Sequence, residues 1–206
     1  MAEVNSGLSS VLALARVYNS LQSLVGDCHA RDVFVREYVA PGAHESILDI
    51  GCGVGNRAPY FPGSSYFGFD PNERYIVTAR KKFASCGTFL CATIDTVQER
   101  IRNRAFSLVL LVGVLHHMDD ELARETIAFA HRNLPPGGRL VTMDACLDGE
   151  KRWLARFMIT HDRGRNVRTV AGTARLVASV FHSHACRLRA DLLRVPYSHV
   201  IAIAER

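Results

Sequence analysis

A turn rich in glycine follows a short apolar run near residue 50. Glycine recurs at three alternate positions, in the order Gly51, Gly53 and Gly55, directly after residues 47–50. Because glycine has no Cβ, such a turn can bend sharply and let the backbone approach a ligand closely. The apolar run predicts a buried strand, and the carboxyl end of the first strand of an open α/β sheet is where a nucleotide-like cofactor lies. The turn is therefore our first candidate for a binding site.

The spacing of these glycines argues against a dinucleotide. A dinucleotide-binding turn reads G-x-G-x-x-G, whereas this one reads G-x-G-x-G, and Asn56 stands where the third glycine would fall. The chain also lacks a Y-x-x-x-K motif after the fourth predicted strand, so a nicotinamide-dependent reductase is disfavoured. An acidic residue, Asp49, lies two positions before the first glycine.

Two further places carry side chains that could do chemistry. Asp70 ends the predicted strand 66–69, about 20 residues after the first glycine, where a carboxylate can accept hydrogen bonds from ribose hydroxyls. Its alternative role is to cap the next helix, with Pro71 in the first helical position. His116 and His117 follow the apolar strand 106–112, and imidazole titrates in the range that suits a general base. Packing, or contact with the base of a nucleoside, is the alternative for either histidine.

Three segments together resemble the class I S-adenosylmethionine (SAM) dependent methyltransferases. Residues 49–55 match their motif [DE]-x-G-x-G-x-G. The sequence VLHH at 114–117 and the turn LPPGGRL at 134–140 are similar to the group related to the ubiquinone/menaquinone C-methyltransferases. The resemblance covers residues 47–144, and it implies an α/β, doubly wound, seven-stranded, mostly parallel Rossmann-like sheet with an N-terminal helical cap. The last two strands would form an antiparallel hairpin.

The resemblance also implies a cofactor, SAM, with S-adenosyl-L-homocysteine (SAH) as product. In that family the glycine turn passes under the methionine and ribose, the acid before it helps to hold the amino-acid end, and the acid after the second strand binds ribose. Asp95 is placed to meet adenine, or to cap a helix. The residues expected to bind the cofactor are Asp49, Gly51, Cys52, Gly53, Gly55, Asp70, Pro71, Thr93, Ile94, Asp95, Val112, Gly113 and His117.

The catalytic and acceptor-binding residues are assigned more loosely. The candidates for catalysis are His117, which we slightly prefer, His116, and Tyr18 from an N-terminal helix that covers the pocket in relatives. A core or surface tyrosine is the alternative for Tyr18. Guanidinium groups suit carboxylates and phosphates, so an anionic acceptor is expected to meet three arginines, or else these lie in a solvated loop. The expected acceptor-binding residues are Tyr18, Arg163, Arg165 and Arg168. No metal is expected, because Gly113 and Ala145 stand where the catechol type carries metal ligands.

Spacing of apolar residues, with proline and glycine as breaks, predicts the remaining elements. Pro59 and Pro62 leave room for only a very short helix after the glycine turn. The expected helices are 8–25, 30–38, 74–83, 119–133, 150–160 and one ending near 181; the expected strands are 47–50, 66–69, 88–92, 106–112, 139–143, 187–193 and 197–204.

Length and composition bound the rest. The 206 residues, 48% of them hydrophobic, suit one domain over 1–206, with a cap at 1–42 and a core at 43–206. No run could span a bilayer and no signal peptide is evident, so we expect a cytoplasmic protein without membrane contact. The six cysteines are scattered as reduced thiols would be. Residues 150–206 carry 11 Lys and Arg against 4 Asp and Glu, a net of +7, whereas residues 1–149 carry a net of −2.

The sequence therefore predicts a SAM-dependent methyltransferase that moves a methyl group to an O, N or C nucleophile. The acceptor would be a small molecule, anionic or linked to phosphate or sugar. An RNA methyltransferase, or a non-catalytic SAM-binding interaction protein, is the alternative. Nucleic acid is disfavoured because no basic stretch is interleaved with aromatic residues. A monomer and a homodimer both remain open.

Overall fold

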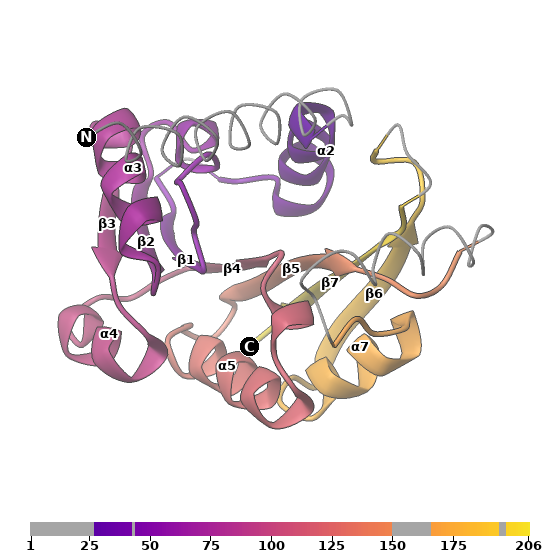
Figure 1. The fold of residues 1–206 in the computed structure, drawn as a ribbon. Helices are drawn as coiled ribbons and strands as arrows, with labels where there is room; N and C mark the ends of the chain where they lie inside the picture. Colours follow the sequence, from indigo (N-terminus) through magenta and orange to yellow (C-terminus); the bar gives the residue numbers. More distant parts are fainter. Residues whose placement is uncertain (1–26, 43, 150–165, 194–196) are drawn as a thin grey trace, which may run out of the picture.

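The computed structural model describes residues 27–42, 44–149, 166–193 and 197–206 (Figure 1). Seven strands form one sheet in the order β3-β2-β1-β4-β5-β7-β6. The strands are β1 (Ser46–Ile50), β2 (Ser65–Asp70), β3 (Thr88–Cys91), β4 (Leu108–Val112), β5 (Arg139–Ala145), β6 (Ser183–Arg189) and β7 (His199–Glu205). Strands β1 to β5 pair in parallel, while β7 is antiparallel to both of its neighbours.

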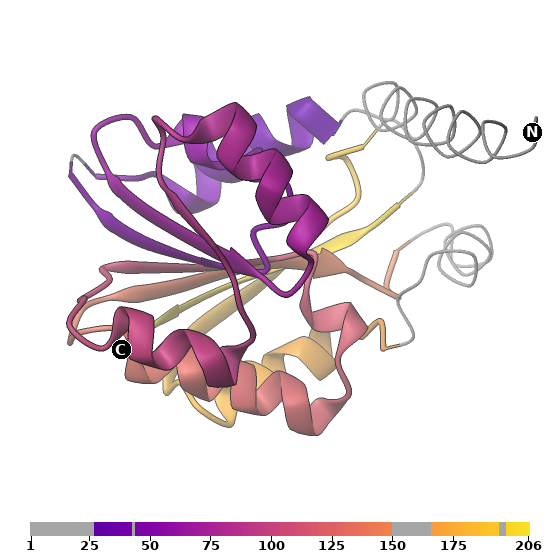
Figure 2. The same cartoon turned by 60° about the vertical axis from the view of Figure 1, so that its left-hand side comes forward.

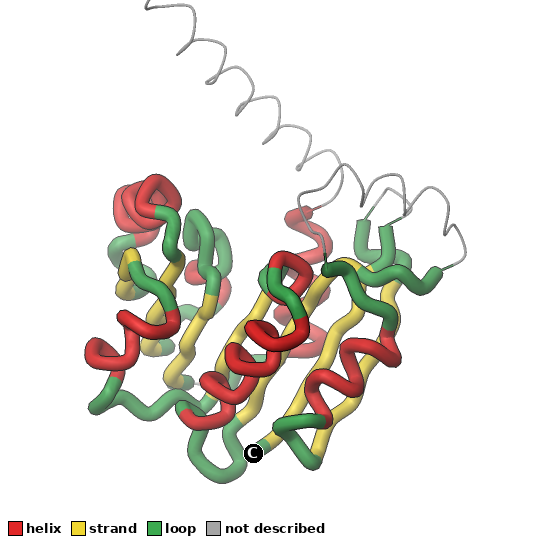
Figure 3. The backbone as a smooth tube through the Cα atoms, turned by 60° about the horizontal axis from the view of Figure 1, so that its bottom comes forward, coloured by secondary structure: helices red, strands yellow, loops and turns green. Residues whose placement is uncertain are grey.

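Helices cover both faces of this sheet (Figures 1 and 2). The described helical segments are α2 (Asp27–Phe34), the π-helix η1 (Val35–Val39), the 3₁₀ turn η2 (Ala58–Tyr60), α3 (Glu73–Phe83), α4 (Ile94–Ile101), the 3₁₀ turn η3 (Leu115–His117), α5 (Asp120–Arg132) and α7 (Val170–Ala178). Figure 3 shows α5 and α7 lying along the strands, as the crossover connections of a doubly wound sheet do. The predicted fold class is confirmed.

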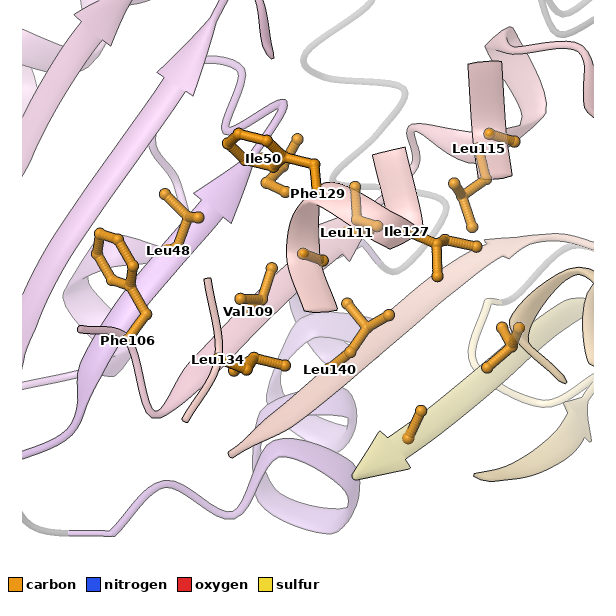
Figure 4. Packing of buried hydrophobic residues seen from close by; sticks show 14 of the residues in the cluster. Leu48, Ile50, Phe106, Val109, Leu111, Leu115, Ile127, Phe129, Leu134 and Leu140 are labelled. Carbon is orange, nitrogen blue, oxygen red and sulfur yellow. The ribbon is translucent and has the colours of Figure 1, made fainter. Parts of the chain in front are cut away.

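The central strands are apolar at consecutive positions because both of their faces are buried. In β1, Ile47 packs with α2 and α3, while Leu48 packs on the opposite face with α4 and α5. In β4, Leu110 and Leu111 divide between the two faces in the same way, and both are fully buried. Figure 4 shows the second of these cores, in which Leu111 lies among Ile127, Phe129 and Leu140.

Arg189, the last residue of β6, connects η1 to this outermost strand of the sheet. Its Nη1 donates to Glu37 Oε2 at 2.7 Å and to the Tyr38 hydroxyl at 2.6 Å, both in η1. Its Nε and Nη2 hold both carboxylate oxygens of Asp191. These hydrogen bonds raise the pKa of Arg189 and lower that of Asp191. The contact joins η1 to the edge of the sheet formed by β6 and β7.

The helix after the glycine turn is the single 3₁₀ turn η2, so the very short helix predicted from Pro59 and Pro62 is confirmed. The bounds of several strands differ from the sequence prediction. Strand β5 continues two residues beyond 143, because Asp144 and Ala145 pair with the start of β7. Strand β6 begins at Ser183, not at 187, because it lies at the edge of the sheet with mostly exposed side chains and so lacks an apolar pattern. The predicted helices 8–25 and 150–160 lie outside the described residues.

No helix among the described residues combines the length and the apolar character needed to cross a bilayer.

Replacing Leu111 by alanine tests the core between the sheet and α5. Leu111 has no exposed surface, so Leu111→Ala should lower the free energy of unfolding by about 2–5 kcal/mol through lost burial and a residual cavity. Leu188, in β6, is 42% exposed, and Leu188→Ala should cost less than about 1 kcal/mol. Urea denaturation of both variants measures the difference. Equal losses would contradict the placement of β4 in the centre of the sheet.

Candidate active site

The parallel strands bring the predicted residues to one edge of the sheet. Strands β1, β2, β4 and β5 all end there. The glycine turn follows β1, Asp70 is the last residue of β2, Gly113 follows β4, and Ala145 is the last residue of β5. Because β7 is antiparallel to β5, its first residue, His199, pairs with Ala145 at this same edge. One edge thus gathers residues that are up to 150 positions apart. We call the part over β1, β2 and β4 the cofactor half and the part over β5 and β7 the second half.

The glycines of the turn all have a left-handed backbone, with φ of +69° at Gly51, +57° at Gly53 and +78° at Gly55. A Cβ on Gly51 would lie 2.6 Å from a methyl group of Val114, and one on Gly55 would lie 2.8 Å from the ring of Phe89. A Cβ on Gly53 would meet no atom within 4 Å. The outer two glycines are therefore required by packing inside the protein, and Gly53 faces open space.

Asp70 closes the turn from the end of β2. Its Oδ2 accepts a hydrogen bond from the backbone N–H of Gly53 at 3.0 Å, and its Oδ1 accepts one from Asn72 N–H at 2.8 Å. The alternative role as a helix cap is wrong, because α3 is capped by Asn72, whose side chain accepts from Arg74 N–H. Each carboxylate oxygen can accept a further hydrogen bond, so Asp70 can still receive ribose hydroxyls.

Asp49 has no exposed surface and lies behind the turn. Both of its oxygens accept from Arg57, at 2.8 Å from Nε and 2.9 Å from Nη2, and the hydroxyl of Tyr66 donates to Oδ2. Burial alone would lower the pKa of Arg57, but the charge of Asp49 raises it above its ordinary range. Burial raises the pKa of Tyr66 and, with Asp49, that of Cys52 in the turn, so both keep their protons.

The remaining predicted cofactor residues lie around this edge. Val112 ends β4, and Gly113 follows it with φ of +70°. Thr93 is the N-cap of α4 and its N–H donates to Thr96 Oγ1 at 2.9 Å, while Ile94 and the exposed Asp95 form the first turn. Asp95 is therefore not the cap that the sequence offered as its alternative role.

The described residues fit a nucleoside carrying an amino acid. The turn leaves open space over Gly53, where a ligand can approach the backbone, and the carboxylate of Asp70 stands beside it with acceptor capacity. Gly113 adds a second open place beside the backbone, because a Cβ on Gly113 would have only His116 Cε1 within 4 Å, at 3.9 Å.

His116 is held by Asp144, a buried residue of β5. Its Nδ1 lies 2.6 Å from Asp144 Oδ1, and its backbone N–H donates to the same oxygen at 3.3 Å. Because an ionised carboxylate only accepts, Nδ1 carries the proton and Nε2 of a neutral ring keeps its lone pair. Asp144 Oδ2 is buried without a hydrogen bond from any described residue. The ring of His117 lies 4.0 Å from that of His116.

His199 completes this half of the edge. Its Nδ1 is buried and has no hydrogen-bond partner among the described residues, and its ring lies 5.1 Å from that of Tyr197. Burial, with a smaller contribution from His116, lowers its pKa from 6.5 to about 4. It therefore stays neutral at physiological pH. A small cavity next to it in the fold is lined by Leu115, His116, Asp144, Ala145, Asn166, Arg168, Thr173 and Leu176.

Arg168 is engaged by the protein itself. Its Nη1 donates to Leu115 O at 2.7 Å, its Nη2 to Met118 O at 2.8 Å, and its Nε to Asp120 at 2.8 Å. It thus fixes the loop that carries the two histidines. Its expected role in binding the acceptor stays a prediction, and the other expected acceptor residues, Tyr18, Arg163 and Arg165, lie outside the described residues.

Sequence reasoning missed Arg57, Asp144 and His199. Arg57 lies eight residues after its partner Asp49, so a search of the sequence for oppositely charged residues close to the glycine turn could have found this pair. Asp144 and His199 are brought together with His116 only by the pairing of β5 with β4 and β7, which no local pattern reveals. Within the described ranges, no group of three or more His, Cys, Asp or Glu side chains is arranged to hold a metal ion. The absence of a metal stays a prediction.

Comparisons with known proteins agree with this geometry. Residues 48–140 match the family model described as Methyltransferase domain. Among curated proteins, an O-methyltransferase of Pyrenophora dematioidea is 30% identical over 123 residues, which cover 57% of this chain and 45% of that protein. The chain spans less than half the length of each curated relative that it matches.

Solved structures share the whole fold at low identity. The plantazolicin methyltransferase BpumL, crystallised with a triazolic desmethylPZN analog and SAH, superposes with a TM-score of 0.70 at 14% identity, covering 94% of this chain and 90% of that one. A TehB-like SAM-dependent methyltransferase from Corynebacterium glutamicum gives 0.65 at 16% identity, covering 96% and 99%. The chain thus shares the fold of these methyltransferases, and its residues 48–140 match a methyltransferase domain model.

The protonation of His199 should appear in the pH dependence of stability. As the pH falls from about 6.5 to about 4, the unfolded chain binds a proton that the folded chain does not, so the free energy of unfolding should fall. The loss from this one group is on the order of 3 kcal/mol, and above pH 6.5 it should vanish. Urea unfolding at intervals from pH 8 to pH 4 would compare the protein with His199→Leu, whose stability should fall less. Parallel curves would contradict a neutral, enclosed His199.

Proposed function

We propose that the protein is a SAM-dependent methyltransferase that methylates a hydroxyl group of a small molecule. The observation that carries the proposal is the joint placement, at one edge of the sheet, of a fitting cofactor half and of an imidazole oriented by a carboxylate. The match to the methyltransferase domain model and the curated O-methyltransferase relative support the same reaction.

In the cofactor half, the chain supplies binding and orientation. Asp70 accepts hydrogen bonds from the ribose hydroxyls, and Gly53 lets the ligand lie against the backbone; the free acceptor capacity of Asp70 and the open space over Gly53 support these roles. SAM, when bound, supplies a methyl group activated by its positive sulfur. Holding two reactants in line and excluding water accounts for most of the barrier lowering that such a displacement needs.

In the second half, the chain supplies a base. A base helps only when the nucleophile carries a proton at neutral pH, as a hydroxyl does. His116 Cε1 is the atom nearest to the missing Cβ of Gly113, so the ring edge that includes the free Nε2 borders the cofactor half. His116 Nε2 can then take the hydroxyl proton, while Asp144 holds the tautomer and stabilises the imidazolium that forms. The contact with Asp144 supports His116 as the base, and His117, which the sequence slightly preferred, stays the alternative.

The acceptor is proposed to carry an anionic, phosphate-linked or sugar-linked group. The support is the net charge of +7 over residues 150–206, together with Arg163 and Arg165 in the segment between β5 and α7. Arg168 contributes less to this proposal than Arg163 and Arg165, because all three nitrogens of its guanidinium group already donate to the chain. A cytoplasmic location and a single domain over 1–206 remain part of the proposal.

Calorimetric titration tests the cofactor. SAH should bind, and NADH should not, because the glycine turn has no place for a diphosphate. Tight binding of NADH without binding of SAH would overturn the proposal in favour of a reductase.

The base is tested by matched histidine variants. Methyl-labelled SAM is incubated with the protein and fractionated extract of its source organism, and the fraction that takes up label serves as acceptor. His116→Gln should lower the rate of methyl transfer about 10²- to 10⁴-fold, whereas His117→Gln, its matched neighbour, should lower it by less than about tenfold. Asp144→Asn should lower the rate while leaving the affinity for SAH unchanged, since it acts through His116. Full activity of His116→Gln would remove the base from the mechanism.

A further inference from the structure

The residue expected to hold the amino-acid end of the cofactor is not accessible to it. Asp49 is fully buried, and its oxygens already accept three hydrogen bonds, two from Arg57 and one from Tyr66. A ligand ammonium could reach this carboxylate only by displacing Arg57. Breaking that pair would leave a buried charge uncompensated, which is strongly unfavourable.

Arg57, in contrast, is both charged and partly accessible. About 13% of its side chain is exposed, while that of Asp49 shows none. Its Nη2 also donates to the carbonyl of Gly51 at 3.2 Å, which places the guanidinium beside the first glycine of the turn. Among the described residues, Arg57 donates hydrogen bonds only through Nε and Nη2. Nη1 donates none to them and is not an enclosed atom. Nη1 therefore remains a donor with access to solvent.

The amino-acid end of the cofactor was expected to meet the negative charge of Asp49. The accessible charge at the turn is instead the positive charge of Arg57. An arginine fork held rigidly at a glycine turn suits a carboxylate, which it binds through charge-assisted hydrogen bonds. Asp49 and Tyr66 fix the orientation of the fork and so lower the conformational entropy lost when it binds.

We propose that Arg57 binds the carboxylate of the methionine part of the cofactor through Nη1, and that Asp49 and Tyr66 are positioning residues for Arg57. The proposal rests on the proposed function, because it requires SAM or SAH to bind at this turn. It predicts that recognition of the amino-acid end depends on the ligand's carboxylate far more than on its ammonium group.

A series of ligands on the unaltered protein decides between these two groups. Calorimetry would compare SAH with an analogue that lacks only the carboxylate and with an analogue that lacks only the amino group. Loss of the carboxylate should weaken binding about tenfold or more, and loss of the amino group by less than about threefold. The opposite order, or equal affinities for all three, would overturn the role of Arg57. If SAH itself did not bind, the proposed function would fall as well, so the two failures are distinguishable.

A neutral pair of substitutions tests the residue directly. The double variant Asp49→Asn with Arg57→Gln replaces the ion pair by two neutral amides, so no buried charge is left without its partner. It should bind SAH no better than it binds the analogue without the carboxylate, while its affinity for that analogue stays unchanged. Retention of the wild-type preference for SAH would contradict the proposal.

Arg139 provides the matched control. It is another partly buried arginine in an ion pair, with Glu45 at 3.0 Å, and it also donates to Val39 O, but it lies at the opposite edge of the sheet at the start of β5. Arg139→Gln should leave the ratio of the affinities for the three ligands unchanged. A similar collapse of the ratio in this variant would show a general loss of structure and would count against a specific contact. If the double variant does not fold, the ligand series on the unaltered protein still gives the answer.

Discussion

The hydrogen bonds between the glycine turn and β2 are the constraint on which the site depends. The backbone N–H groups of Gly51 and Cys52 both donate to the carbonyl of Phe69, at 2.9 and 3.0 Å, and the N–H of Gly53 donates to Asp70. These bonds form only because β1 and β2 are parallel and in register, with Ile50 opposite Phe69. The turn that follows β1 is thus fixed by the strand next to it, so its shape does not depend on a long helix after it.

That arrangement explains how the protein tolerates so short a helix after the turn. In a doubly wound fold, the segment after the first strand packs on the sheet and orients the turn. Here η2 has three residues, and the charge pair of Arg57 and Asp49 holds this segment against the turn instead. A buried ion pair adds little net stability, but it specifies one arrangement, since losing one partner is costly. The packing of Gly55 against Phe89 and Ala79 fixes the other end of the turn.

The residues that the structure gathers around the glycine turn could be predicted from the sequence because the features that mark them are local. The glycines, the acid before them and Asp70 are separated by about 20 residues, and each has a backbone reason for its identity that survives in the linear pattern. The fold class followed from the same features. The sequence could not show which way Asp49 faces. The motif specifies an acidic residue at this position whether its carboxylate binds a ligand or Arg57. Bounds of exposed elements such as β6 were also missed, since solvent imposes no period on their side chains.

The second half of the edge is built from contacts between distant residues, and this limits what a pattern can reveal. His116 meets Asp144 across 28 positions, and the loop that carries it is held by Arg168 from 53 positions beyond Leu115. The backbone N–H of Asn166 also donates to the carbonyl of His116. The two adjacent histidines are equivalent in the sequence, and only the folded chain shows that β5 supplies a carboxylate to His116. The position of His116 therefore depends on residues 144 and 166–168, which lie beyond the match to the methyltransferase domain model at 48–140, so that match leaves the acceptor open.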